Sequence, residues 1–250
     1  MKRLISGLSL ALAFVANASA QVTSPVSSQV SSQLTYNVAG VSDYRYRGIS
    51  QTRLRPALQG GADWADAGSG LYVGTWLSTT RWTRDAGGDG SIEWDVYAGK
   101  RGSIGNGSGV TYDVGVLGYA YPSSGLHPDA DTLEVYGQLG YGPATLKYSH
   151  AATNLFGFAD SRHSGYLDAS VNHDAGGGWI VNLHAGRQKV RNHDNASYTD
   201  WKAGVTRDFG VVTVALAWIG TNAGKSAYAS PVNGKFTGRD AVLLTVSKVF

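Results

Sequence analysis

The fold is decided by residues 133–149, which read LEVYGQLGYGPATLKYS. In each half of this stretch apolar side chains alternate with polar ones, and the polar parity carries Glu134, Gln138 and Lys147. Successive side chains of a strand point to opposite faces, so this alternation predicts two strands, each with one apolar and one polar face. Residues 140–143, Gly-Tyr-Gly-Pro, supply the turn chemistry between them. The stretch therefore predicts an antiparallel hairpin.

The same alternation recurs from Leu34 to Phe250 in about twelve segments, each of the length that a tilted strand needs to cross a bilayer. The connections alternate in length. Short, glycine-rich turns are predicted at residues 66–70, 105–109, 140–143, 174–178 and 208–210. Longer loops are predicted at residues 49–55, 82–90, 122–131, 151–163, 190–197 and 221–238. An even strand count with short-long alternation is typical of an outer-membrane barrel with periplasmic turns and extracellular loops.

A soluble sandwich or barrel would also alternate, but with its polar face outward. Burying the charged parity of these strands in a dry core would cost several kcal/mol for each unpaired charge. Turning Lys147 or Lys202 toward lipid at mid-bilayer would cost about 2–4 kcal/mol each. The sequence therefore predicts an all-β, transmembrane, antiparallel up-and-down β-barrel with the apolar parity facing lipid and the charged parity facing a hydrated lumen.

The N-terminus has the features of a secretory signal peptide. Lys2 and Arg3 precede an apolar run over residues 4–15, and residues 18–20, Ala-Ser-Ala, match a cleavage site. We expect residues 1–20 to be a cleaved signal peptide, residues 21–33 a flexible periplasmic segment, and residues 34–250 an outer-membrane barrel. Cleavage would bring the formal net charge of +3 close to neutral, and the chain contains no basic run, so nucleic-acid binding is not expected.

Aromatic residues gather near the predicted strand ends. One set lies near the long loops and another near the short turns, and the two sets predict interface girdles: Tyr44, Tyr46, Trp82, Tyr119, Tyr121 and Tyr166 on the outer side, and Tyr36, Trp64, Tyr72, Trp179, Phe209 and Phe250 on the inner side. Phe250 also ends an alternating strand, as the assembly signals of outer-membrane barrels do. We expect the barrel-assembly machinery to recognise it.

The stretch at residues 41–52, VSDYRYRGISQT, is followed by Pro-Ala-Leu-Gln-Gly at residues 56–60, and together they resemble the opening of the TorF-type putative porins of proteobacteria. Shorter similarities follow at residues 93–99, 112–115, 119–122, 134–136 and 246–250. The resemblance covers the chain from about Leu34 onward. It implies an outer-membrane barrel and a porin function.

An enzyme, a metal site and a cofactor are not expected. Some outer-membrane barrels hydrolyse lipids with a His-x-Ser-Asn pattern, but Ala152 stands where His150 would need a serine. The histidines show no ligand spacing on one strand face. Residues 85–90 contain two aspartates and three glycines but lack the downstream acid of a calcium loop.

The charged parity is where function is expected. A lumen with charges of both signs favours hydrated, polar solutes, so we predict a porin for their passive diffusion. Barrels of about eight strands are filled by side chains and those of about sixteen hold a channel, so twelve strands leave open a non-conducting structural or surface-interaction barrel closed by salt bridges. The predicted pore-lining residues are Asp43, Arg45, Arg47, Asp63, Glu93, Asp95, Asp113, Glu134, Lys147, Asp168 and Lys202.

Basic residues flank several long loops, among them Arg45, Arg47, Arg53 and Arg55 beside the first. Two interpretations are open: a basic rim would bind lipopolysaccharide phosphates, or it would concentrate anions at the mouth. By parity Arg45 and Arg47 are expected to point inward, where they would act on solutes or pair with acids such as Asp43. The expected partners are outer-membrane lipid, lipopolysaccharide and small polar solutes, with the oligomeric state left open.

Overall fold

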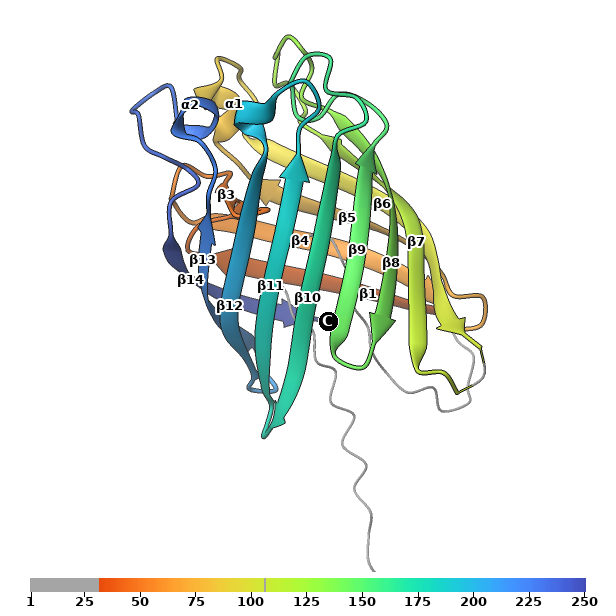
Figure 1. Ribbon diagram of the computed structural model, residues 1–250. Coiled ribbons are helices and arrows are strands. Elements are labelled where there is room, and N and C mark those ends of the chain that lie inside the picture. The colour runs from red at the N-terminus through yellow and green to blue at the C-terminus, as the bar shows by residue number, and fades with distance from the viewer. Residues whose placement is uncertain (1–31, 106) are drawn as a thin grey trace, which may run out of the picture.

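The computed structural model describes residues 32–105 and 107–250. The predicted signal peptide and nearly all of the predicted periplasmic segment lie outside these residues. Twelve antiparallel strands close into a barrel in which sequence neighbours pair and β1 joins both β4 and β14 (Figure 1). The all-β transmembrane barrel with about twelve strands, predicted from the alternation, is confirmed in its architecture. The barrel strands are β1 (Ser32–Val41), β4 (Ala57–Asp66), β5 (Leu71–Thr79), β6 (Ile92–Ile104), β7 (Val110–Ala120), β8 (Thr132–Tyr141), β9 (Ala144–Ala151), β10 (Gly165–Gly176), β11 (Trp179–Lys189), β12 (Tyr198–Asp208), β13 (Thr213–Thr221) and β14 (Ala241–Val249).

The remaining elements are short and lie at the loop end of the barrel (Figure 1). They are β2 (Arg45–Tyr46), β3 (Ile49–Ser50), α1 (Trp82–Asp85), α2 (Lys225–Tyr228) and a 3₁₀ turn, η1 (Asp194–Ala196). Among the described residues, no helix is both long and apolar enough to cross a membrane. We name the six long connections L1 (42–56), L2 (80–91), L3 (121–131), L4 (152–164), L5 (190–197) and L6 (222–240).

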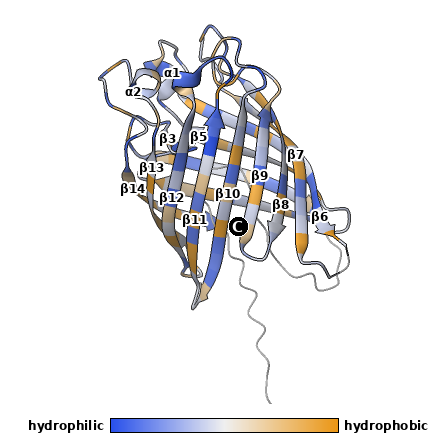
Figure 2. Cartoon of the chain, viewed as in Figure 1, coloured by the Kyte–Doolittle hydropathy of each residue, from blue (hydrophilic) through white to orange (hydrophobic). Residues whose placement is uncertain are grey.

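The alternation of the sequence becomes the two faces of the barrel wall. Leucine, valine and tryptophan side chains such as Leu58, Trp94 and Leu216 are exposed on the outer surface, while their sequence neighbours point into the lumen. Figure 2 shows hydrophobic residues recurring along the strands of the wall. The cross-strand pairs keep the parity, since Gln138 pairs with Lys147 and Lys147 with Asp168. A one-residue slip would turn these charges toward lipid, so the apolar face and the register specify each other.

The first strand ends earlier than the alternation predicts. The pattern extends the strand to Arg47 and places the loop at residues 49–55, whereas β1 ends at Val41 and β4 begins at Ala57. The residues between them leave the wall and form L1, which contains the β2–β3 hairpin. Their alternation continues because the hairpin is itself extended, so periodicity alone does not mark the boundary.

The predicted outer aromatic girdle is wrong. Tyr44, Tyr119, Tyr121 and Tyr166 are buried, and Tyr46 lies against Tyr119 with its ring edge, so these tyrosines pack inside the barrel and not at the lipid interface. Tyr72, which was predicted for the girdle near the short turns, also points into the lumen. The other five aromatics of that inner set are exposed: Tyr36, Trp64, Trp179, Phe209 and Phe250. Interior tyrosines keep a hydroxyl that can reach a carboxylate, which suits them to a charged lumen.

Candidate functional site: the lumen and its first loop

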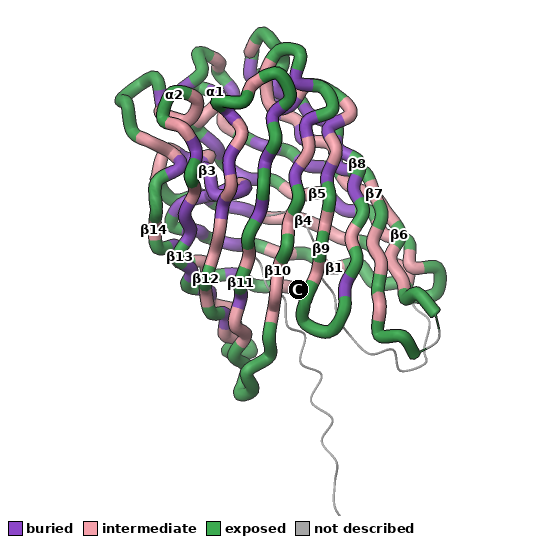
Figure 3. The backbone as a smooth tube through the Cα atoms, viewed as in Figure 1, coloured by how far each residue is buried: buried purple, intermediate pink, exposed green. Residues whose placement is uncertain are grey.

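The residues predicted to line a pore lie on the inner side of the barrel, in two layers that differ in burial. Six are buried toward the loop end: Asp43, Arg45, Arg47, Glu93, Asp95 and Glu134. Five lie nearer the short turns and are partly exposed: Asp63, Asp113, Lys147, Asp168 and Lys202. Figure 3 shows many buried segments toward the loop end and a smaller number lower on the wall. The lumen is therefore packed in its outer half, whereas the inner half combines these partly exposed charges with the buried polar side chains Asn182, Thr206 and Ser247.

L1 fills the outer half because its hairpin folds inward. Arg45 pairs with Ser50 and Tyr46 with Ile49, which leaves Arg47 and Gly48 as the turn. Both turn residues have positive φ, 47° and 81°, as the tight turns of hairpins require. A Cβ on Gly48 would lie 2.8 Å from Cβ of Asp200 on β12. Glycine at position 48 thus satisfies the turn and lets the tip approach the opposite wall.

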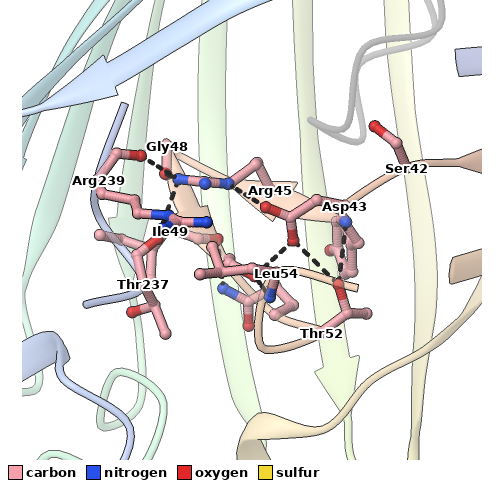
Figure 4. A network of polar contacts seen from close by, with 12 residues as sticks. Ser42, Asp43, Arg45, Gly48, Ile49, Thr52, Leu54, Thr237 and Arg239 are labelled. Carbon is pink, nitrogen blue, oxygen red and sulfur yellow. Dashed lines mark hydrogen bonds and ion pairs between the residues drawn. The ribbon is translucent and has the colours of Figure 1, made fainter. Parts of the chain in front are cut away.

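The base of the hairpin is held by one buried carboxylate (Figure 4). Asp43 accepts a hydrogen bond from Nε of Arg45 at 2.6 Å, and two more from the hydroxyls of Ser50 and Thr52 at 2.5 and 3.0 Å. Nη1 of Arg45 donates to the backbone oxygens of Gly48, Thr237 and Arg239 at 2.8, 3.0 and 2.9 Å. The ion pair therefore braces the hairpin and connects it to L6. Arg45 is paired with Asp43 and not directed at solute in the mouth.

The tip of the hairpin reaches across the lumen through Arg47. Its guanidinium donates to both carboxylate oxygens of Glu134 on β8, at 3.0 and 2.8 Å, and to the side-chain oxygen of Gln188 on β11 at 2.8 Å. The same group lies 4.2 Å from the ring centre of Tyr166 on β10. A planar guanidinium suits this combination of forked hydrogen bonding and stacking, which the point charge of a lysine would not reproduce.

The charge states at this loop agree with the contacts. Burial opposes the charge on Arg47, but the carboxylate of Glu134 outweighs it, and the pKa of Arg47 lies above its ordinary value. Burial, together with nearby Glu93, raises the pKa of Tyr44. Tyr44 therefore keeps its proton, and its hydroxyl donates a hydrogen bond to Glu93 at 2.6 Å.

Every strand of the barrel contributes a buried, inward-facing side chain to the outer half. Around the ring these are Ala39, Gln59, Ser78, Glu93, Tyr119, Glu134, Ser149, Tyr166, Gln188, Asp200, Ile219 and Leu243. Glu93 and Asp95 stand on one strand and are both 1% exposed. Tyr121 also donates to Glu93, at 2.9 Å, whereas Oδ1 of Asp95 has no hydrogen-bond partner. The outer ring is thus closely packed and carries buried carboxylates on its β6 side.

The inner half has a different organisation, in which tyrosines orient the acids. Tyr97 donates to Asp63 and Tyr72 donates to Asp113, both at 2.5 Å. Nζ of Lys147 stands 3.9 Å over the ring of Tyr136. Tyr136 is buried, but the two acids, their tyrosine partners and Lys147 are only partly buried, so water reaches the charges of this half of the lumen.

A histidine on β11 completes the inner wall. His184 lies between two carboxylates, with Nδ1 3.2 Å from Asp168 and Nε2 2.7 Å from Asp200. His184, Tyr97 and Tyr136 were not among the residues predicted to line the pore. Their polar parity is the signal that would have identified them, since tyrosine and histidine both bond carboxylates inside a charged lumen.

The residues considered for catalysis and for metal binding, His150 and Asp85, make contacts of an ordinary structural kind. His150 contacts His163 through ring nitrogens 2.9 Å apart, and Ala152 follows it at the position that the hydrolase pattern assigns to serine. Asp85 accepts hydrogen bonds from Arg53 of L1 and Ser230 of L6, which connects three loops. Within residues 32–105 and 107–250, no group of three or more His, Cys, Asp or Glu side chains is placed to hold a metal ion.

The barrel is similar to solved structures of porins. The KdgM porin has 7% sequence identity and a TM-score of 0.54, over 88% of this chain and 98% of that one. The NanC porin has 11% identity and a TM-score of 0.51, over 86% of this chain and 98% of that one. At these identities the similarity concerns the fold. No curated protein matches the chain in sequence.

A family model matches the sequence over residues 23–250, which is nearly its whole length. This match includes L1 and every strand of the barrel. The chain belongs to the bacterial family Gcw_chp, whose function is unknown.

Proposed function

We propose that the protein is an outer-membrane channel of porin type, through which small polar solutes diffuse. The observation that carries the proposal is the partly exposed, charged inner half of the lumen, which contains Asp63, Asp113, Lys147, Asp168 and Lys202. A lumen that only filled space would gain nothing from charges that remain in contact with water. Mixed charges at a hydrated wall favour polar solutes and disfavour apolar ones.

The similarity to two proteins named as porins and the resemblance to the TorF-type putative porins both support this proposal. The same proposal includes export by a cleaved signal peptide and residence in the outer membrane. The lipid-facing surface would contact outer-membrane lipid, and exposed arginines of the rim, such as Arg84 and Arg191, would bind lipopolysaccharide phosphates. We also propose Phe250 as the residue that the barrel-assembly machinery recognises, since its backbone is hydrogen-bonded to Tyr36 where β14 and β1 close the barrel.

A second candidate is a non-conducting barrel that presents its loops at the cell surface. The packed outer ring favours it, because twelve strands and L1 together bury that half of the lumen. The two candidate functions assign opposite roles to L1. In a channel L1 restricts a path that continues through the barrel, whereas in a non-conducting barrel it is one part of a solid interior.

Conductance in planar lipid bilayers separates the candidates. We expect the purified protein to show small or intermittent single-channel currents. A variant in which residues 44–52 are replaced by a flexible Gly-Ser segment should show larger and steadier ones. A matched control replaces residues 231–235 of L6, which are all exposed, in the same way and should behave as the wild type. If the L1 variant folds, as judged by its heat-modifiable mobility in gels, and still passes no current, the channel function is wrong and the structural barrel is favoured.

A further inference from the structure

The contacts of L1 divide into those that shape the hairpin and those that hold its tip against the wall. Shape comes from Asp43, which binds three partners within L1, and from the two-residue ladder between β2 and β3. At the turn, Arg47 binds Glu134 and Gln188 on the far side of the lumen. Nearer the base, Arg45 and the backbone of Ser50 bond the backbone of L6, and the hydroxyls of Tyr46 and Tyr119 share a hydrogen bond. Among the contacts that residues 45–50 make with the wall, the pair of Arg47 and Glu134 is the one in which both partners are charged, so it is the contact that a change of charge would release.

The contact between Arg47 and Glu134 is stable only while both side chains are charged. Glu134 is 2% exposed and Arg47 is 5% exposed, so the pair has given up nearly all contact with water. A buried ion pair offsets that desolvation only while both partners are charged and well placed, and removing one leaves the other buried without compensation. Loss of either charge therefore favours a state in which the remaining group reaches water.

Solvent lies within reach on the inner side of this contact. Along β8 the residue two positions after Tyr136 is Gln138, which is partly exposed, and its cross-strand partner Lys147 belongs to the hydrated inner half. Glu134 thus lies on the same strand face as that hydrated wall, about two residue pairs above it. A released guanidinium would move from a packed site toward a wetter one.

We infer that Arg47 and Glu134 form the latch of the lumen's constriction, and that the hairpin turn at Arg47 and Gly48 is the part that moves when the channel opens. This inference rests on the proposed channel function. It assigns the closed state of the pore to one ion pair and not to the barrel wall. The wall itself is a continuous hydrogen-bonded cylinder, so it has no comparable freedom to move.

The test replaces each charge of the latch by a neutral polar side chain. Glu134→Gln keeps the size of the side chain and its oxygen acceptor, and Arg47→Gln removes the opposite charge. Each variant should raise the open probability or the single-channel conductance severalfold above wild type in planar bilayers. Asp174→Asn is the matched control, because it neutralises an exposed carboxylate at the turn between β10 and β11, where Asp174 accepts a hydrogen bond from the backbone of Gly176, and it should leave the frequency of opening unchanged.

A crosslink provides the reverse experiment. The chain has no cysteine, and a Cβ on Gly48 would lie against the methyl group of Thr221 on β13. Gly48→Cys with Thr221→Cys, introduced into Glu134→Gln, should close the channel under oxidising conditions and reopen it with reductant. Each single cysteine variant should be insensitive to reductant.

The outcomes separate failure of the latch from failure of the channel function on which it rests. Unchanged currents in both neutralised variants, together with large currents when residues 44–52 are replaced, would overturn the latch and leave the channel standing. Absence of current in all of these folded variants would overturn the channel and the latch with it.

Discussion

The outer and inner halves of the lumen are made from the same strands and the same inward parity, yet they differ in what they contain. On β8, Glu134 of the outer half is buried against Arg47, whereas Gln138 of the inner half remains partly exposed. On β6, Glu93 and Asp95 are buried, whereas Arg101 is only partly buried. The difference comes from L1, which enters one half and not the other. A strand therefore determines which side chains face inward, and a loop determines whether water reaches them.

Removing a carboxylate from each half should have unequal effects on stability, and this is the largest effect that we expect. Glu134→Ala leaves the guanidinium of Arg47 buried without its ion-pair partner, and the free energy of unfolding should fall by about 3–5 kcal/mol. Asp113→Ala loses one hydrogen bond at a partly hydrated position and should cost about 1 kcal/mol. Urea unfolding in lipid vesicles measures both. Equal losses would contradict the division of the lumen into packed and hydrated halves.

Two glycines in turns provide a comparison of intermediate size. Gly48 and Gly142 both have positive φ, 81° and 56°, so an alanine at either position should cost about 1 kcal/mol. Only at Gly48 would the new Cβ meet the opposite wall, whereas at Gly142 nothing lies within 4 Å. Gly48→Ala should therefore lower the free energy of unfolding by about 1–3 kcal/mol more than Gly142→Ala. A difference near zero would mean that the tip of L1 does not press against β12 and β13.

The smallest expected effect concerns how readily a water-soluble reagent reaches each half of the lumen. Ser149 and Thr145 face inward on β9, but Ser149 is 4% exposed while Thr145 is partly exposed. Thr145→Cys should react readily with a water-soluble thiol reagent, and Ser149→Cys should react slowly, with little change in stability for either. Replacing residues 44–52 should bring the rate at position 149 toward that at position 145. Fast labelling at both positions in the otherwise unchanged protein would show that the outer half is open to water.

Much of the architecture was predictable from local pattern. Period-two alternation identifies the wall strands, and the charges of Lys147 and Asp168 show which face of each strand points inward. The glycine-rich turns mark the end of the barrel at which both termini lie. These inferences succeed because a barrel wall repeats one physical requirement, apolar outside and polar inside, at every strand. The family resemblance at residues 41–52 also pointed to the stretch that forms L1, but it implied nothing about where that loop lies.

The structure corrected the inferences that depend on distance through space. Tyr119 and Tyr166 have the residue type and the chain position of interface aromatics, yet both are buried in the lumen. Arg47 was expected to face inward from the first strand, but its partners, Glu134 and Gln188, lie on β8 and β11. No spacing in the sequence predicts such contacts, since they depend on which strands face each other across the closed barrel.

The sequence by itself determined which face of each strand meets lipid, because a charge turned toward mid-bilayer costs about 2–4 kcal/mol and the side-chain period of a strand leaves one choice of register. Only the tertiary structure decided that the extended residues after Val41 leave the wall and cross the lumen. An extended hairpin and a wall strand have the same periodicity. What separates them is whether their backbone groups pair with the neighbouring strands or with each other, and for residues 45–50 the pairing is local.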